Sequence, residues 1–271
     1  MTRTGKIGFI GGGNMAEAFI KGLLASGVSP DEVMASEPRA DRREWMHEQY
    51  GVVVTADNSE LVKQCATIVL ATKPQIVEKV LEGVVAEFDH DKLLISILAG
   101  IPTAKLERIL GGKPRIVRAM PNTPALVGAG AAAVCPGQYT SQEDLDRAKK
   151  LFELIGTVVQ VEEMQMDAVT GLSGSGPAFV YTFIEALADG GVQEGLRRDI
   201  AQELAVQTVL GAALLVKESG EHPALLRDKV CSPAGTTISA IRVLEERGLR
   251  STIMETVAAA SKRSKELGGQ E

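Results

Sequence analysis

A glycine-rich turn near the start of the chain has the spacing of a phosphate-binding loop. The run Ile7-Gly-Phe-Ile-Gly11-Gly-Gly13-Asn-Met-Ala16 places the pattern G-x-G-x-x-A between a predicted strand and a predicted helix. In such a turn Gly11 permits the sharp bend and Gly13 leaves room for a pyrophosphate, while the small Ala16 lets helix and strand pack closely. The free N–H groups at the start of the helix then face the phosphates. The pattern predicts a dinucleotide site.

The end of the second predicted strand bears on the choice of dinucleotide. It reads Ala35-Ser36-Glu37-Pro38-Arg39. A carboxylate at Glu37 would accept a hydrogen bond from a ribose 2′-hydroxyl and favour NAD, whereas Ser36 with Arg39 would hold the 2′-phosphate of NADP. Both alternatives stay open on these residues alone.

The run Leu70-Ala71-Thr72-Lys73-Pro74 follows another predicted strand. Ligands of doubly wound sheets bind outside the carboxyl ends of the strands, so this run should border the same dinucleotide. Because the residue before a proline is held extended, we expect the backbone of Lys73 to position the cofactor and its amine to stay in solvent.

A turn late in the chain could hold a carboxylate. Ser232-Pro-Ala-Gly235 is followed by a helical pattern from Thr236 to Leu244. The first-turn N–H groups of a helix lack intrahelical partners, and hydroxyl groups surround them here. Such a helix start binds an anion without any Arg or Lys, although an ordinary helix cap would have the same sequence.

Two different periodicities divide the chain near residue 163. Before it, short β-branched runs alternate with amphipathic stretches, which predicts a parallel sheet covered on both faces. The expected strands are 6–10, 33–35, 67–70, 93–96 and 115–118, and the helical stretches between them include 15–25, 39–49 and 75–88. After it, only helices are expected, at 164–172, 177–190, 198–218, 236–246 and 249–266, with glycines at 190 and 191 ending the second. We therefore predict a Rossmann-type α/β domain over 1–163 and an all-α domain over 164–271.

The stretch from Ile200 to Val216 is apolar around most of its circumference. One neighbour cannot cover so wide a stripe, since a surface helix needs an apolar face of only about 100°. The helix is either the core of an isolated bundle or is buried against a partner subunit, and we favour the second alternative, an obligate dimer.

Composition excludes several classes of function. The chain has 29 Lys+Arg against 35 Asp+Glu, a formal charge of −6, and no basic run, so nucleic acid is not an expected partner. The apolar stretch 125–136 is too short to span a bilayer. Cys65, Cys135 and Cys231 stand far apart, so no metal or redox pair is expected and a reducing cytoplasm fits best.

Further runs carry a family resemblance. They are Arg118-Ala-Met-Pro-Asn122-Thr-Pro124, Thr170-Gly-Leu-Ser-Gly174-Ser-Gly-Pro177-Ala and Ser232-Pro-Ala-Gly235-Thr236-Thr237-Ile. Together with the glycine turn, they resemble the Δ1-pyrroline-5-carboxylate reductase family over residues 7–266. The chain departs from the family at Ala234, where a second glycine is usual.

The resemblance implies NAD(P)H-dependent reduction of a cyclic imine to L-proline, the last step of proline biosynthesis, with NADPH used better than NADH. It also implies a helical domain that interlocks two subunits, and dimers assembled further into rings such as a decamer. The cofactor residues expected from the motifs and the resemblance are Gly11, Gly13, Asn14, Met15, Ser36, Arg39, Asn58, Ala71, Thr72, Lys73, Pro74 and Ala99. The expected substrate residues are Ser232, Gly235, Thr236, Thr237 and Pro177, the last because the small residues before it let backbone approach the substrate ring.

Hydride transfer to a C=N bond requires a proton on nitrogen, and an imine is basic enough to carry one near neutral pH. No strong acid is therefore demanded, and His47, His90 and His222 all lie outside the substrate motifs, with His222 expected to cap a helix. Thr237 is the expected catalytic residue, orienting the substrate nitrogen, with proton relay left open, because a hydroxyl is too weak an acid to act alone.

Two other functions remain as alternatives. Another NAD(P)-dependent oxidoreductase, such as a hydroxyacid dehydrogenase of similar plan, should carry a catalytic Lys on the first long helix of the second domain, but no Lys occurs between Met164 and Glu194. A non-catalytic NADPH-binding protein would keep the glycine turn without needing a carboxylate-binding loop.

Overall fold

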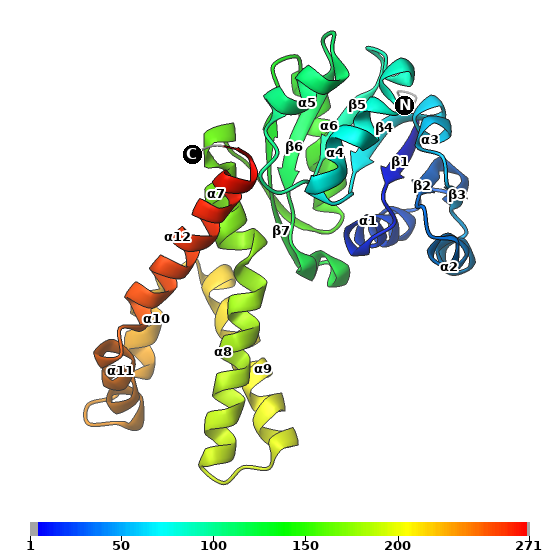
Figure 1. Cartoon of the computed structure of the whole chain (residues 1–271). Coiled ribbons are helices and arrows are strands. Elements are labelled where there is room, and N and C mark those ends of the chain that lie inside the picture. The colour runs from blue at the N-terminus through cyan, green and yellow to red at the C-terminus, as the bar shows by residue number, and fades with distance from the viewer. Residues whose placement is uncertain (1–4, 270–271) are drawn as a thin grey trace. The chain divides into compact units, whose positions relative to one another are not determined.

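The computed structural model describes residues 5–269, so the first four residues of the predicted domain 1–163 and the last two of 164–271 lie outside the described residues. It divides into two compact units, 1–175 with 258–271 and 176–257. The first unit contains an eight-stranded sheet in the order β3-β2-β1-β4-β5-β6-β7-β8 (Figure 1). The strands are β1 Lys6–Ile10, β2 Val33–Ser36, β3 Val53–Thr55, β4 Cys65–Leu70, β5 Leu93–Ser96, β6 Arg115–Met120, β7 Gly130–Pro136 and β8 Gly156–Gln160.

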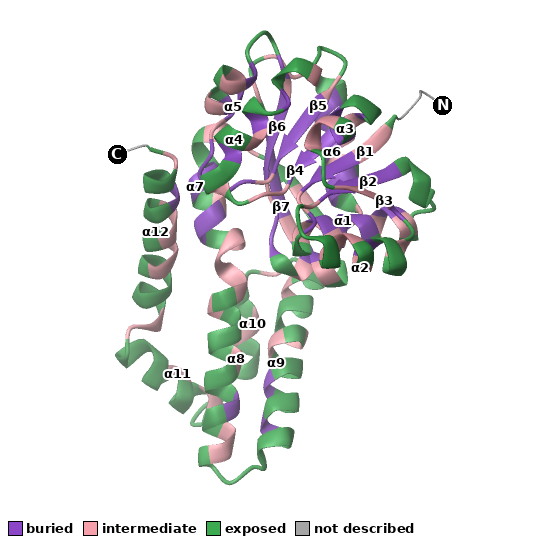
Figure 2. Cartoon of the chain, turned by 45° about the vertical axis from the view of Figure 1, so that its right-hand side comes forward, coloured by how far each residue is buried: buried purple, intermediate pink, exposed green. Residues whose placement is uncertain are grey.

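Helices cover both faces of the sheet, as a doubly wound fold requires. They are α1 Asn14–Ala25, α2 Ala40–Tyr50, α3 Asn58–Gln64, α4 Val77–Glu82, α5 Thr103–Leu110 and α6 Gln142–Glu153. Successive strand residues point to opposite faces, so Phe9 of β1 packs with α1, α2 and α6, whereas Ile10 packs with α3, α4 and α5. Figure 2 shows the buried strands between these two layers.

The sheet is mixed, which corrects the expectation of a parallel sheet. Strand β7 runs antiparallel to β6, and β8 pairs parallel to β7. The stretch 75–88 also differs from the expected single helix, because it is broken into 3₁₀ turns at Pro74–Ile76 and Val85–Glu87 around the short α4. The proline at the start of this stretch opens a turn instead of a long helix.

The remaining helices are α7 Met166–Val169, α8 Gly176–Gln193, α9 Arg198–Ser219, α10 Pro223–Val230, α11 Thr236–Glu246 and α12 Leu249–Leu267. A π-helical turn, Thr170–Gly174, joins α7 to α8. The expected glycine stop at 190–191 is wrong, because α8 continues through both glycines to Gln193. A Cβ on Gly191 would lie 3.2 Å from the Cβ of Ala201, so this glycine allows α8 and α9 to pack closely.

The compact units do not follow the change of periodicity near residue 163. Residues 164–175 and the end of α12 cluster with the sheet. The reason is a set of polar contacts within the first unit: Ser264 Oγ donates to Asp167 Oδ1 at 2.6 Å, and both side chains are buried. Gly100, with φ +74°, brings the loop after β5 against the last turn of α12.

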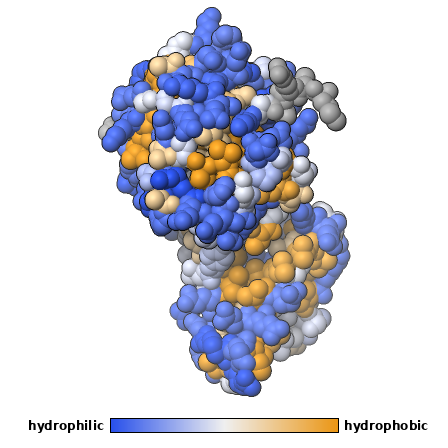
Figure 3. Space-filling view, turned by 90° about the vertical axis from the view of Figure 1, so that its right-hand side faces the viewer, coloured by the Kyte–Doolittle hydropathy of each residue, from blue (hydrophilic) through white to orange (hydrophobic). Residues whose placement is uncertain are grey.

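The second unit exposes many large apolar side chains, which gather on its surface in Figure 3. Those on α9 are Ile200, Leu204, Val206, Leu210, Leu214 and Leu215. An 18-residue window of this helix has a mean hydropathy of 1.4, so the helix could cross a membrane by length and composition alone. An exposed apolar face of this extent marks a surface that interacts with another protein or with a membrane.

Candidate functional site

Two glycines of the turn after β1 are needed for different reasons. Gly11 has φ +106°, and a Cβ there would lie 2.6 Å from the carbonyl oxygen of Ala71, which directly follows the neighbouring strand β4. Gly13 has an ordinary φ of −76°, and a Cβ on it would meet nothing within 4 Å. Protein packing therefore explains Gly11 but not Gly13. The open space at Gly13 is where a pyrophosphate would approach the backbone.

Helix α1 begins directly after this space. Gly13 is its N-cap and offers no side-chain hydrogen bond, and the first helical residues are Asn14 and Met15. Their N–H groups therefore have no side-chain acceptor at the cap and lie at the positive end of the helix dipole. These residues fit the phosphates of a dinucleotide.

The peptide groups of Gly12 are held by two charged side chains. Glu37 Oε2 accepts the Gly12 N–H at 3.0 Å, and Arg42 Nε donates to the Gly12 carbonyl oxygen at 2.7 Å. Arg42 also donates to Glu17 at 2.7 Å and lies 4.2 Å from the ring centre of Trp45. Burial alone would raise the pKa of Glu17, but its hydrogen bonds from Arg42, Lys21 and Tyr50 outweigh burial and hold that pKa below the usual value. The glycine turn is thus fixed before a ligand arrives.

This arrangement bears on the choice between NAD and NADP at the end of β2. Glu37 already accepts the Gly12 N–H, and its other oxygen pairs with Arg39 Nε at 3.2 Å. Ser36 is buried and donates to Asn58 Oδ1 at 2.6 Å, which brings these two predicted residues together. Arg43 donates to the carbonyl groups of Glu37 and Pro38. Sequence reasoning missed Arg42 and Arg43 as part of this site, although Arg43 lies one helical turn after Arg39.

The run after β4 lies beside the glycine turn. The Ala71 N–H donates to the Ile10 carbonyl oxygen at 2.9 Å, and Lys73 is extended with φ −77° and ψ 141°, as its position before Pro74 predicts. Its side chain is exposed. Thr72 Oγ1 is buried and has no hydrogen-bond partner among the described residues. A Cβ on Gly11 would lie 3.3 Å from the Thr72 nitrogen, so this unpaired buried hydroxyl belongs to a residue beside the glycine turn, where it fits a polar contact to a ligand.

Ala99, the remaining predicted cofactor residue, follows β5 and is half-buried. Ser96, the last residue of β5, carries a second unpaired hydroxyl, because its Oγ is buried and has no partner in the described part of the chain. The predicted cofactor residues therefore lie along the carboxyl ends of β1, β2, β4 and β5.

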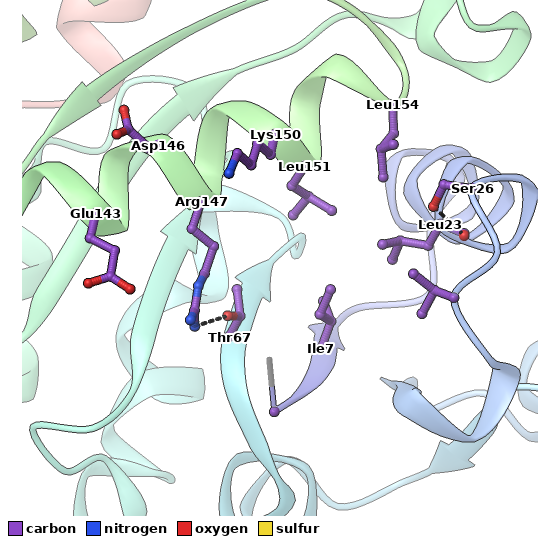
Figure 4. A pocket seen from close by; sticks show the side chains of 12 residues that line it. Ile7, Leu23, Ser26, Thr67, Glu143, Asp146, Arg147, Lys150, Leu151 and Leu154 are labelled. Atoms are coloured by element: carbon purple, nitrogen blue, oxygen red, sulfur yellow. Dashed lines mark hydrogen bonds between the residues drawn. The ribbon is translucent and has the colours of Figure 1, made fainter. Parts of the chain in front are cut away.

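The pocket in Figure 4 is a different feature. It has a volume of about 550 Å³ and is lined by residues from the amino ends of β1 and β4 and from α6. Arg147 of α6 reaches Thr67 at 3.4 Å inside it. Dinucleotides bind outside the carboxyl ends of the strands, so this pocket is not the cofactor site.

The loop before α11 forms a tight turn. The Gly235 N–H donates to the Ser232 carbonyl oxygen at 3.0 Å, with Pro233 and Ala234 between them. Ala234 has φ +57°, the one left-handed non-glycine among residues 5–269. Proline followed by a left-handed residue is the pattern of a type II turn. The departure from the family's glycine therefore falls where glycine is favoured, and the Cβ of Ala234 costs about 1–2 kcal/mol.

The same turn presents hydroxyl groups around the start of α11. Gly235 is the N-cap and makes no side-chain cap, so the first N–H groups of the helix are left for another acceptor. A Cβ on Gly235 would overlap the Ser232 hydroxyl, so glycine there lets that hydroxyl lie against the turn. Thr236 is exposed and Thr237 is half-buried. The arrangement can hold a carboxylate with N–H and O–H groups alone.

Pro177 lies in the first turn of α8, directly after Gly176, where a Cβ would meet nothing within 4 Å. The structure places Pro177 in a different helix of the second unit from the Ser232–Thr237 turn. His222 caps α10, accepting the Ala224 N–H at its Nδ1 at 3.2 Å, which confirms the expected capping role.

Two of the three cysteine thiols are buried. Burial raises the pKa of the Cys65 thiol to about 11 and that of Cys135 to about 12, so both stay protonated near neutral pH. Among residues 5–269, no group of three or more His, Cys, Asp or Glu side chains is arranged to hold a metal ion.

Two sequence families match the chain. The family described as pyrroline-5-carboxylate reductase dimerisation matches residues 163–267, and the one described as NADP oxidoreductase, coenzyme F420-dependent, matches residues 6–100. The first match begins where the periodicity changes, and the second contains the glycine turn and the end of β4.

Relatives match over nearly the whole chain. The pyrroline-5-carboxylate reductase of Synechocystis sp. is 50% identical over 266 residues, which cover 97% of this chain and 98% of that relative. The structure of a pyrroline-5-carboxylate reductase from Coxiella burnetii is 38% identical, with a TM-score of 0.92, and covers 98% of this chain and 99% of that one. The Plasmodium falciparum pyrroline carboxylate reductase with NADP bound is 34% identical, with a TM-score of 0.90, and covers 99% of this chain and 100% of that one.

The two glycines of the turn predict opposite phenotypes. Gly13→Ala adds a methyl group that meets no protein atom, so the thermal unfolding midpoint without ligand should stay unchanged while NADPH binding weakens at least tenfold. Gly11→Ala should instead lower the unfolding midpoint, because the new Cβ meets the Ala71 backbone and φ is positive. Calorimetry and NADPH fluorescence titration measure both. Unchanged NADPH affinity in Gly13→Ala would contradict the assignment of the phosphate site.

The strain at Ala234 predicts a stabilising substitution. Ala234→Gly should raise the free energy of unfolding by roughly 0.5–1 kcal/mol, since the left-handed conformation costs alanine more than glycine loses through its flexible unfolded state. The matched control is Ala240→Gly in α11, which should lower stability by about 0.5–1 kcal/mol. Urea unfolding at one protein concentration compares them. A destabilised Ala234→Gly would show that the turn is not strained.

Proposed function

Because this chain belongs to the pyrroline-5-carboxylate reductase family, we propose that the residues at its two helix starts divide the family's reaction between them: α1 holds NADPH and α11 holds 1-pyrroline-5-carboxylate, which is reduced to L-proline. The observation that carries this proposal is the pair of uncapped helix starts, one beside the open space at Gly13 and one next to the hydroxyl-bearing residues Ser232, Thr236 and Thr237. When bound, NADPH supplies the hydride that the imine carbon accepts.

The glycine turn holds the cofactor's phosphates and ribose. The N–H groups of Asn14 and Met15 bind the pyrophosphate, which the missing Cβ of Gly13 lets approach. Ser36, Asn58 and Arg39 surround the 2′-phosphate of the adenosine ribose. Glu37 already accepts a hydrogen bond from Gly12 and pairs with Arg39, which partly compensates its negative charge. This arrangement supports NADPH over NADH, and NADH binds more weakly in this proposal.

The nicotinamide end lies along the strand ends β4 and β5 in this proposal. Ala71, Thr72, Lys73 and Pro74 contribute backbone, with the unpaired Thr72 hydroxyl as one polar contact. Ala99 contributes from the loop after β5. The extended backbone at Lys73 keeps this edge open for a flat ring.

The substrate's carboxylate binds at the start of α11. Ser232 and Thr236 offer hydroxyl groups, and the N–H groups beyond Gly235 complete the site. Thr237 is the catalytic residue: its hydroxyl hydrogen-bonds the substrate nitrogen and orients the C=N bond. Pro177 contributes an apolar surface to the ring. Bringing reacting atoms to near contact in this way supplies most of the protein's share of catalysis.

No strongly acidic side chain is needed to protonate the substrate. An imine near neutral pH already carries a proton, and the thiols of Cys65 and Cys135 are held in the neutral form by burial. Thr237 can accept a hydrogen bond from that N–H and needs no shifted pKa.

The chain forms a homo-oligomer with a helical dimerisation domain. The apolar face of α9, which qualifies as a membrane span by composition, is covered by the second subunit in this proposal. In this proposal the division of function stays at the change of periodicity, 1–163 for the cofactor and 164–271 for dimerisation and substrate, although the compact units divide at residues 175 and 258. Dimers assemble further into a ring such as a decamer, as the family resemblance implies. The enzyme works in the cytoplasm, whose reducing conditions fit the three separated cysteines.

The two alternatives find less support. A hydroxyacid dehydrogenase would need a Lys on α8, and Gly176–Gln193 contains none. A non-catalytic NADPH-binding protein has no use for the strained turn at Ala234 before an uncapped helix.

The direct test is a reductase assay. The purified protein should oxidise NADPH only when pyrroline-5-carboxylate is added, and proline should form in equal amount. With NADH in its place, kcat/KM should be lower. Cofactor oxidation without proline formation would contradict the reaction, and a higher kcat/KM with NADH would reverse the assignment of Ser36 and Arg39.

Thr237→Val tests the substrate site. Valine keeps the shape but removes the hydrogen bond at the reacting nitrogen, which is worth roughly 1.5–3 kcal/mol, or about 10- to 150-fold in kcat/KM. NADPH affinity should stay the same. Thr256→Val on α12 removes a helical Thr hydroxyl of the same kind, which donates to the Thr252 carbonyl, and should leave kcat/KM unchanged. An equal loss in both variants would remove Thr237 from the site.

A further inference from the structure

The run Arg118-Ala-Met-Pro-Asn122 has no role in the scheme above, although it covers the end of β6 and the two residues after it. Asn122 is 8% exposed, and both ends of its side-chain amide are used. Its Oδ1 accepts the Ala131 N–H of β7 at 2.9 Å, and its Nδ2 donates to the Ser173 carbonyl oxygen at 3.0 Å. Asn122 thus joins the sheet to the π-helical turn that precedes α8.

The Ser173 carbonyl needs this donor for a reason that lies in the sequence. In a continuous α-helix, a carbonyl accepts the N–H four residues later, and four residues after Ser173 is Pro177, which has no N–H. The helix widens just before this point, where the Ser175 N–H donates to the Thr170 carbonyl oxygen at 2.9 Å. Such π-helical turns occur frequently at functional sites.

Two alternate residues of β6, and Asn122 just after it, contact the segment 163–174. Arg118, Met120 and Asn122 point to one side, since side chains of extended backbone alternate and Asn122 is still extended with φ −137° and ψ 168°. Arg118 donates to Glu163 at 3.2 Å, and a Cβ on Gly174 would lie 2.5 Å from Met120 Cε. The motif is therefore one face of a strand that holds the chain from 163 to 174.

We propose that Asn122 is a positioning residue for substrate binding, which supplies the N–H that Pro177 lacks and so fixes the segment that carries Pro177. The proposal rests on the proposed function in taking Pro177 as a substrate contact. The proline gives the segment its apolar surface, and the asparagine satisfies the carbonyl that the proline leaves without a partner.

A double-mutant cycle tests this coupling. Asn122→Ala should raise KM for pyrroline-5-carboxylate and lower kcat/KM at least tenfold, while the NADPH dissociation constant stays within twofold. Pro177→Ala restores an N–H four residues after Ser173, so adding Asn122→Ala to it should cost less than threefold more. The loss of the Ala131 contact is common to both backgrounds and cancels in the cycle.

Two further variants serve as controls for the double-mutant cycle. Asn122→Asp keeps the acceptor for Ala131 but loses the donor, so it should fold and show the same kinetic loss if Asn122→Ala does not fold. Thr140→Val removes side-chain hydrogen bonds to Ile116 at the other end of β6, and it should lower the unfolding midpoint without changing KM for the imine.

The unfolding midpoints of the cycle separate this proposal from the function itself. If the wild-type protein does not reduce pyrroline-5-carboxylate, the proposed function fails, while thermal unfolding still reports whether Asn122 and Pro177 are coupled. Equal effects of Asn122→Ala in both backgrounds, in kinetics and in unfolding, would overturn the proposal. So would an unchanged KM for the imine in a folded Asn122→Asp.

Discussion

Backbone polar groups without a regular partner are the constraint on which this structure depends. A buried N–H or C=O must find a hydrogen bond, and the chain answers this requirement in two ways. Where the backbone must stay rigid, side chains supply the partner, as Glu37 and Arg42 do for Gly12 and Asn122 does for Ser173. At the starts of α1 and α11 the N–H groups have no side-chain cap and can take a ligand. The N-cap residues of α2, α5 and α9 also make no side-chain cap, so the open space at Gly13 and the hydroxyl groups of the Ser232–Thr237 turn are what distinguish the two proposed sites.

The local sequence pattern was sufficient to predict some parts of the fold. The five expected strands lie within two residues of their observed bounds, because short β-branched runs report burial in a sheet directly. Strands β3, β7 and β8 were not expected. In β7 the run Gly130-Ala-Ala-Ala has little β propensity, and it is a strand through its pairing with β6 and β8. The glycine turn was recognised as a motif, but only packing separates Gly11, which the protein needs, from Gly13, which it does not.

Long-range contacts explain what sequence spacing could not predict. Glu37 and Gly12 are 25 residues apart, Asn122 and Ser173 are 51 apart, and Ser264 and Asp167 are 97 apart. No periodicity reports such pairs, so Glu37 looked free to bind a ribose and the chain looked divisible at one point. The buried Asp167 shows why a single boundary is insufficient. It ties the end of α12 to the unit that contains the sheet, so that unit is built from two separate stretches of the chain.

The chemistry explains why the substrate turn can do without a cation. The imine of pyrroline-5-carboxylate carries a proton near neutral pH, so the bound molecule has a carboxylate and a positive nitrogen. Hydride transfer to the carbon makes the nitrogen a neutral amine, which then takes a proton from water to give the ammonium group of proline, and the carboxylate stays unchanged throughout. Contacts to the carboxylate are therefore equally strong before and after hydride transfer, and they set affinity more than rate. A strong ion pair there would hold product as tightly as substrate. The geometry at the ring nitrogen and carbon does change during the reaction, and the proposed site places Thr237 at this nitrogen. Only the C=N bond of the ring is altered, so uncharged N–H and O–H groups are sufficient for the carboxylate.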